Sequence, residues 1–233
     1  MKYSLSTCLA VIGMASAHSW VECTDHDNKD LLQKMIAGSQ KTPPELIDPV
    51  FFPEKCRGWP RAKANPGDWI DESTNFSWNI AAKSWEGDRS ACNPSQRSPG
   101  QEANAPMATV SPGGTIKLRF GGNGHTRGTT AGANNDPGQV SVYWAGAKET
   151  EIQTIDEFTD ANRIAQAGFA DDSFSYPADP SIISATQGLV DKGNWMDVTM
   201  PTNMEPGRHM LAWVWSYDNA PQWSTCFDVQ IQA

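Results

Sequence analysis

Short stretches of alternating apolar and polar residues, separated by turns rich in glycine and proline, fill the chain from about residue 107 onward. Residues 115–120 and 139–144 show the alternation most clearly, and the turn before the first of them contains Pro112 and two glycines. This pattern is typical of half-buried strands, and several such strands at close spacing predict an all-β sandwich. The expected strands are residues 107–110, 115–120, 139–144, 195–200, 210–215 and 225–231, with a loop at 217–221 between the last two.

The remaining regions predict long loops and short helices around this sandwich. Residues 29–37 have apolar residues at helical spacing, and a second short helix is expected at 159–167. Residues 53–106 are rich in proline, glycine, asparagine and serine, and a loop of this length indicates either a functional role or stapling by disulfides. We find no internal repeat and no low-complexity linker, so residues 18–233 are expected to form a single domain.

Residues 1–17 have the three parts of a secretory signal. Lys2 provides the positive start, residues 9–12 are apolar, and Ala15-Ser16-Ala17 is a small-x-small cleavage site. The apolar run is too short to span a bilayer. The sequence therefore predicts a secreted, extracellular and soluble product that begins at His18.

The balance of charges excludes several classes of partner. The net charge is −9, and removal of Lys2 with the signal makes it more negative still. A nucleic-acid-binding protein needs a basic footprint that this chain lacks, and an anionic membrane is equally disfavoured. An acidic polysaccharide remains compatible, because salt screens charges that lie more than about 10 Å away.

Four cysteines remain once Cys8 is removed with the signal: Cys23, Cys56, Cys92 and Cys226. An even number of cysteines in an oxidising compartment predicts two disulfides. Three pairings are compatible with the sequence. Proximity along the chain and the layout of the strands favour Cys23–Cys56 with Cys92–Cys226. A cysteine-rich zinc site is the competing interpretation, but the chain contains no C-x-x-C pair.

Two histidines, His18 and His125, are the candidate metal ligands. As the first residue, His18 would offer both its α-amine, with a reference pKa of about 8, and its ring. An amine and imidazoles together suit a tetragonal Cu(II) site. His125 follows the strand at 115–120 in a loop with four nearby glycines, which can bend closely around a metal. Taken singly, each could also be an ordinary surface or loop histidine.

The combination of these features resembles the lytic polysaccharide monooxygenases. The cleavage site directly before His18, the glycine-rich loop around His125, and the closing stretch 207–215 leading to Cys226 carry the resemblance. The opening residues 18–23 and the segment 56–61 look most like the pectin-active branch. The resemblance implies an immunoglobulin-like or fibronectin-like β-sandwich. It also implies one copper ion, cycling between Cu(II) and Cu(I), held by His18 and His125 and supplied with electrons by an external donor.

The sequence departs from this family at the axial metal position. The usual Tyr or Phe lies three residues before Cys226, and Trp223 stands there in this chain. Because indole is not a normal ligand, Trp223 is expected to shield the metal, with Tyr217 as the other candidate. Gln222 is close to the usual neighbouring glutamine but one residue out of register.

Candidate contacts to the substrate come from aromatic and basic side chains. Most tryptophans, among them Trp213 and Trp215, are expected in the core, whereas Trp20 and Trp59 are the candidates for a surface that stacks on sugars. The densest basic cluster could bind the carboxylates of an acidic glycan, although an ordinary solvated surface run is the simpler interpretation. Its members are Lys55, Arg57, Arg61 and Lys63.

These observations favour one function over two alternatives. The leading hypothesis is a secreted, monomeric, copper-dependent monooxygenase that uses O₂ or H₂O₂ to cleave a polysaccharide, with plant cell-wall pectin (homogalacturonan) as the expected substrate. A non-catalytic copper-binding protein with the same histidines predicts bound copper without oxidised sugars. A metal-free carbohydrate-binding module predicts no effect of copper. No hydrolase motif is present in the sequence.

Overall fold

The computed structural model describes residues 19–27, 55–64, 76–120, 136, 138–169 and 194–233. Strands dominate this part of the chain, and its helical elements are short. None of the described helices is long and apolar enough to cross a membrane. In chain order the elements are β1 Val21–Cys23, β2 Trp78–Asn79, α4 Ile80–Trp85, η2 Pro94–Gln96, β3 Ala108–Val110, β4 Thr115–Phe120, β5 Gln139–Trp144, η4 Ile155–Glu157, β6 Arg163–Gly168, β7 Asn194–Thr199, β8 Gly207–Tyr217 and β9 Ala220–Ile231.

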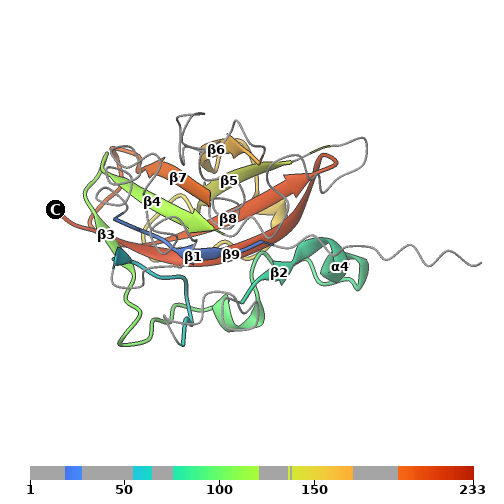
Figure 1. Cartoon of the computed structure of the whole chain (residues 1–233), viewed down its shortest axis with the longest axis horizontal. Coiled ribbons are helices and arrows are strands. Elements are labelled where there is room, and N and C mark those ends of the chain that lie inside the picture. The colour runs from blue at the N-terminus through green and yellow to red at the C-terminus, as the bar shows by residue number, and fades with distance from the viewer. Residues whose placement is uncertain (1–18, 28–54, 65–75, 121–135, 137, 170–193) are drawn as a thin grey trace, which may run out of the picture.

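The strands form two sheets that enclose a shared core (Figure 1). One sheet has the order β1-β4-β7, and its pairs are antiparallel. The other has the order β2-β9-β8-β5-β6, and β3 pairs with β9 in parallel. The prediction of an all-β, immunoglobulin-like sandwich with stapled loops and short helices is confirmed.

The core lies between β4 and β8, and the alternation along each strand explains it. Leu118 and Phe120 of β4 are fully buried, as are Trp213 and Trp215 of β8. The rings of Phe120 and Trp213 meet across the sheets with their centroids 5.2 Å apart. The expectation that Trp213 and Trp215 belong to the core is confirmed.

The prediction of a helix at 159–167 is wrong, because most of this segment forms a strand. Residues Arg163–Gly168 form β6, which pairs with β5 through Gln139↔Gly168 and Val142↔Ala165. The apolar residues of this segment match a helical spacing as well as an alternating one. Pairing with β5, which lies outside this segment, decides between helix and strand.

The expected loop at 217–221 is shorter in the structure. β8 and β9 run almost to the turn, which leaves only Asp218 and Asn219 between them. Both residues have positive φ, 52° and 59°, as a two-residue type I′ hairpin turn requires. Asp136 holds the turn from outside, since one of its carboxylate oxygens accepts from the Asp218 N–H at 2.7 Å.

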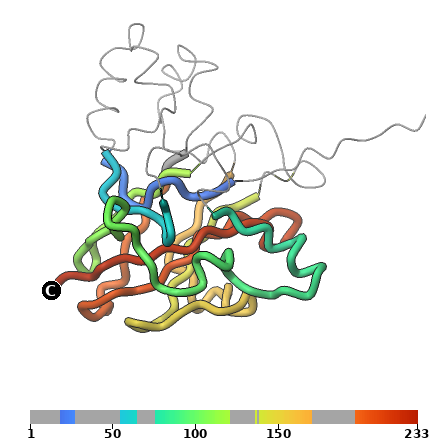
Figure 2. The backbone as a smooth tube through the Cα atoms, turned by 90° about the horizontal axis from the view of Figure 1, so that it is seen from below, coloured from blue at the N-terminus to red at the C-terminus, as the bar shows by residue number. Residues whose placement is uncertain are grey.

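Both disulfides form as the sequence favoured, Cys23–Cys56 and Cys92–Cys226. The first ties the segment 55–64 to β1, and Thr24 N–H donates to the Gly58 carbonyl at 2.8 Å beside it. Figure 2 shows this segment (cyan) running next to β1 (blue). The second disulfide joins the stretch after α4 to the middle of β9.

Several predictions fall outside the described residues. They are the signal at 1–17, the helix at 29–37, and the two candidate copper ligands, His18 and His125. The division into a signal and one domain therefore stays a prediction.

Candidate functional site

The register of β1 against β4 pairs the strand that follows His18 in sequence with the strand that precedes His125. Val21, the first residue of β1, pairs with Phe120, the last residue of β4. The strands are antiparallel, so the chain that comes from His18 and the chain that continues toward His125 pass through one end of the same strand pair. The pairing of the two histidines themselves stays a prediction.

The last strand holds the start of β1 in place. The Val21 N–H donates to the Thr225 hydroxyl of β9 at 3.1 Å in a buried position. On the other side, the Ser77 hydroxyl donates to the Ser19 carbonyl at 3.4 Å. Because Ser19 is fully buried, the residue directly after His18 is enclosed by the protein.

Trp223, the expected axial residue, lies on the same strand at this end of the sandwich. It is two residues before Thr225, so the two side chains project from the same face of β9. Trp223 is only 5% exposed, belongs to the main core cluster, and pairs across the sheet with Trp215. The structure therefore places Trp223 near the start of β1 as a buried side chain.

Tyr217, the other axial candidate, interacts with Trp223. Burial raises the pKa of the Tyr217 hydroxyl above 10, and this effect outweighs a hydrogen bond from the Trp223 side chain, which lowers it. The Tyr217 ring also meets Trp215 edge-on at a centroid distance of 5.1 Å. The phenol is thus protonated at neutral pH. Gln222 is engaged with the backbone, since its amide donates to the Tyr217 carbonyl at 3.2 Å.

The two tryptophans expected on the surface are buried, so that expectation is wrong. Trp20 is 2% exposed and Trp59 is 3% exposed. Trp59 packs with the Cys23–Cys56 disulfide and Ala105. Its backbone N–H donates to the Pro106 carbonyl, which lies before β3. Neither indole presents a ring face to solvent, where a sugar could stack.

The expected basic surface cluster is also wrong for two of its four members. Arg61 and Lys63 are fully buried. Arg57 remains 60% exposed and forms an ion pair with Asp25 at 3.0 Å, and Lys55 is exposed. An acidic glycan could reach only Arg57 and Lys55 of this cluster.

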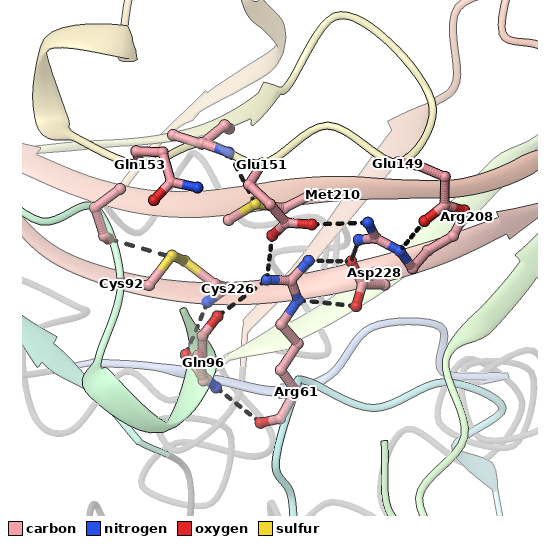
Figure 3. A network of polar contacts seen from close by, with 12 residues as sticks. Arg61, Cys92, Gln96, Glu149, Glu151, Gln153, Arg208, Met210, Cys226 and Asp228 are labelled. Carbon is pink, nitrogen blue, oxygen red and sulfur yellow. Dashed lines mark hydrogen bonds and ion pairs between the residues drawn. A yellow bond between two sulfur atoms is a disulfide. The ribbon is translucent and has the colours of Figure 1, made fainter. Parts of the chain in front are cut away.

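Figure 3 shows why Arg61 lies inside. Its guanidinium binds Asp228 of β9 through two hydrogen bonds of 2.8 and 2.5 Å, and it reaches Glu151 at 2.6 Å. Arg208 of β8 binds the same Asp228 at 2.8 Å. Burial lowers the pKa of Arg61, but the hydrogen bonds to Asp228 and Glu151 outweigh burial and raise it overall. Arg61 is a structural cation that joins the stapled segment to the large sheet.

Sequence reasoning missed Trp85, which is 93% exposed. It ends α4, a helix that directly follows β2, and β2 pairs with β9 at Trp223. Figure 1 shows α4 at the same end of the sandwich as the turn between β8 and β9. The residues one helical turn earlier, Ala81 and Ala82, are small and offer an indole little to pack on, and this signal was available in the sequence.

No group of three or more His, Cys, Asp or Glu side chains within the described ranges could hold a metal ion. The predicted donor set consists of the amine and ring of His18 with the ring of His125. Among the described residues, the contacts at this end of the strand pair are Val21 with Thr225 and Tyr217 with Trp223.

Residues 54–172, just over half of the chain, match a family described as Domain of unknown function (DUF7492). A comparison with curated protein sequences finds no match. Among solved structures, the chain is similar to a chitin binding domain from Burkholderia pseudomallei, with 13% identity, 92% of this chain and 99% of that chain covered, and a TM-score of 0.36.

Two polysaccharide-active proteins are also similar in structure. One is an LPMO from Kitasatospora papulosa, with 14% identity, 92% of this chain and 98% of that chain covered, and a TM-score of 0.39. The other is a cellulose-active polysaccharide monooxygenase from M. thermophila, with 17% identity, 63% and 62% covered, and a TM-score of 0.34. At these identities and TM-scores the likeness transfers no activity to this chain.

Proposed function

We propose that this chain, which belongs to the family described as Domain of unknown function (DUF7492), is a secreted, copper-dependent monooxygenase that cleaves polysaccharides. The observation that carries the proposal is the pairing of Val21 with Phe120, which leads the chain segments of His18 and His125 to one end of a strand pair. The two disulfides support an extracellular location, because such bonds persist in oxidising compartments.

The proposed metal ligands are the amine and ring of His18 and the ring of His125. Three nitrogen donors suit copper, and the α-amine can lose its proton near neutrality. When bound, copper supplies one-electron chemistry with O₂ or H₂O₂, given an external electron donor. The rest of the site is the chain's own contribution.

The described residues position the donors and limit access of water. Thr225 and Ser77 fix the backbone on either side of Trp20, and the role we propose for these two contacts is to orient the amine of His18. Trp223 contributes a buried apolar wall whose side chain is hydrogen-bonded to Tyr217. The protonated phenol of Tyr217 adds no charge near the metal at neutral pH. This arrangement favours shielding over ligation by either side chain.

We assign pectin as the substrate from the resemblance of residues 18–23 and 56–61 to the pectin-active branch. Burial of Arg61 and Lys63 leaves Arg57 and Lys55 as the cations of that region that can meet uronate groups. Trp85 replaces Trp20 and Trp59 as the proposed sugar-stacking side chain, since its ring is exposed at the same end of the sandwich as Trp223. The protein is proposed to act as a monomer.

A second candidate is a non-catalytic protein that binds copper through the same histidines. The observation that favours it is Trp223, an indole where the resembled family has Tyr or Phe, with its side chain already hydrogen-bonded to Tyr217. Both candidates predict tight copper binding, so turnover is what separates them.

The decisive experiment uses protein processed to begin at His18. Calorimetry should show tight uptake of one Cu(II), and His125→Ala should weaken it by more than the 10–100-fold typical of outer-shell groups. A matched control retains one residue before His18, which converts the amine into an amide and should weaken binding in the same way. Binding that is equally tight in all three proteins would overturn the proposed ligand set.

Turnover is tested on copper-loaded protein with a reductant and homogalacturonan, cellulose, chitin or xylan, with products read by mass spectrometry. Oxidised oligosaccharides from homogalacturonan support the full proposal, whereas products from another glycan overturn only the assignment to pectin. Bound copper without any oxidised product favours the second candidate. If the protein neither binds copper nor yields oxidised products, the two candidate functions are overturned.

The role of Trp85 is tested by affinity for the productive substrate. We expect Trp85→Ala to weaken binding by roughly three- to tenfold, because an aromatic contact is worth about 0.5–1.5 kcal/mol. Trp85→Phe keeps a ring and should retain part of the affinity. Unchanged affinity in Trp85→Ala, with unchanged stability, would remove this residue from the proposed surface.

A further inference from the structure

A cleft of about 350 Å³ opens beside the beginning of β8, far from the candidate copper end. Trp144, Lys148, Glu205 and His209 line it, together with Asn203. His209 and Tyr217 stand near opposite ends of β8, eight residues apart, which is about 26 Å in an extended strand. The cleft therefore cannot be part of the proposed oxidation site, yet its volume is within the roughly 300–1,000 Å³ of known ligand pockets.

The wall of the cleft is an indole held in one orientation. The Trp144 Nε1–H donates to Nδ1 of His209 at 3.1 Å. His209 is 1% exposed, and its Nε2 is 2.8 Å from the Glu205 carbonyl oxygen. Since Nδ1 accepts, the proton lies on Nε2 and is donated to that carbonyl, so both ring nitrogens are used. Trp144 itself stays partly exposed with its polar edge already satisfied.

The rim of the cleft has polar groups of balanced charge. Lys148 Nζ lies 2.9 Å from a carboxylate oxygen of Glu205, and their side chains are 50% and 68% exposed. Asn203 adds an exposed amide. An ammonium donates, a carboxylate accepts, and an amide does both, so the rim can satisfy hydroxyl groups of either role without any net charge.

We propose that this cleft binds an uncharged pyranose unit of a glycan, with the sugar ring against Trp144 and its hydroxyls on Lys148, Glu205 and Asn203. The apolar face of the indole fits the C–H face of a sugar ring, and a preset indole loses little freedom on binding. A uronate is disfavoured because its carboxylate would compete with Glu205 for Lys148. The site anchors the protein to a neutral glycan, whichever polymer the proposed copper site acts on.

Anchoring has a quantitative consequence. A second contact at the opposite end of β8 raises the effective concentration of the protein at a surface that offers both ligands. Loss of the cleft should therefore lower binding to an insoluble mixed glycan, whereas turnover on a short soluble substrate stays unchanged.

The test uses metal-free mature protein, so that its result does not depend on the proposed copper chemistry. Cello-, xylo- and chito-oligosaccharides are titrated against protein with ¹⁵N-labelled tryptophan, with oligogalacturonides as the charged comparison. We expect a neutral oligosaccharide to shift the Trp144 indole signal saturably. Asn203→Ala and Lys148→Ala, both on the exposed rim, should each weaken binding by roughly three- to tenfold.

Lys83→Ala is the matched control, because Lys83 of α4 forms a similar exposed ion pair with Glu86, the residue that follows the helix, outside the cleft. It should leave the affinity unchanged. The proposal is overturned if no neutral oligosaccharide shifts the Trp144 signal, if oligogalacturonides bind more tightly than the neutral series, or if the rim variants match the control. Failure to oxidise any glycan would overturn the proposed function and leave this result intact.

Discussion

The pKa of the partly buried Tyr217 hydroxyl depends on its neighbour Trp223. Burial raises its pKa above 10, the hydrogen bond from Trp223 lowers it in part, and the nearby charge of Asp218 raises it further. A phenol with a raised pKa holds its proton more tightly in the folded state than in the unfolded chain. The stability that this provides is present below pH 10 and is lost as the pH rises through the pKa of the folded state.

Replacing Trp223 tests this pair. We expect Trp223→Phe to raise the pKa of Tyr217 further, because the indole N–H that stabilises the phenolate is removed. The measurement is an alkaline titration of metal-free protein, followed by the ultraviolet absorbance of phenolate. Tyr217→Phe is the control and should remove the contribution of this tyrosine from the curve. A lower pKa in Trp223→Phe would contradict the contact.

Arg57 and Arg61 lie four residues apart in sequence and differ in environment. Removing the buried Arg61 leaves Asp228 with a weakened set of partners, so Arg61→Met should cost about 3–5 kcal/mol of unfolding free energy. In the Arg57–Asp25 pair only the arginine is exposed, with 60% of its side chain exposed against 8% for Asp25, so Arg57→Met should cost less than Arg61→Met. Urea denaturation of the two variants gives both values. Equal losses would show that the network of Arg61 is not the anchor that its burial indicates.

The same two arginines mark a limit of sequence reasoning at this scale. A run of cations predicts surface positions, because charged side chains are seldom buried without partners. The partner of Arg61 is Asp228, 167 residues further along the chain. Trp59 likewise packs around a disulfide whose pairing had to be inferred. Burial of such residues depends on contacts that no local pattern displays.

At the scale of elements, the turn between β8 and β9 offers a direct test. Asn219 has positive φ, a conformation that most L-residues enter at a cost of about 1–2 kcal/mol and glycine enters freely. Asn219→Gly should therefore stabilise the protein by up to about 1 kcal/mol, and Asn219→Ala should destabilise it. Thermal unfolding followed by circular dichroism ranks the three proteins. A Tm for the glycine variant below that of the alanine variant would refute the assignment of the turn.

The elements also show which patterns a sequence reveals. Residues 115–120 and 139–144 match β4 and β5 to the residue, because alternate apolar residues of each strand enter the main core cluster. β6 was missed because its Ile-Ala-Gln-Ala run fits helix and strand alike. β1 and β2 contain three and two residues, too few for any periodicity. Long half-buried strands are thus predictable, and short or edge strands depend on their partners.

Across the whole molecule, the two disulfides constrain the unfolded chain to different extents. Cys92–Cys226 spans 134 residues and Cys23–Cys56 spans 33. The chain-entropy estimate gives about 5 kcal/mol for the longer loop and about 4 kcal/mol for the shorter. We expect the paired replacement Cys92→Ala with Cys226→Ala to destabilise the protein more than Cys23→Ala with Cys56→Ala. Denaturation of both double variants checks the order, and a reversed order would contradict it.

The candidate site was only partly predictable. The sequence named His18, His125 and Trp223, and the observed register of β1 against β4 is compatible with the first two meeting. It could not reveal that Thr225 holds the start of β1 or that Trp223 is bonded to Tyr217, because both contacts depend on the packing of distant strands. Trp85 escaped notice because α4 was not predicted, so the small residues one helical turn before it were not recognised as leaving its ring exposed.

β9 has a consequence for how the protein is made. Its residues pair with β2, β3 and β8, accept the N–H of Val21 from 204 residues away, and close a disulfide to Cys92. A chain that emerges from the ribosome can pair β1 with β4 early, but it lacks the bond from Val21 to Thr225 until β9 follows. The contacts around the start of β1 are thus completed late, and a nascent chain stalled before β9 would lack both Thr225 and Trp223.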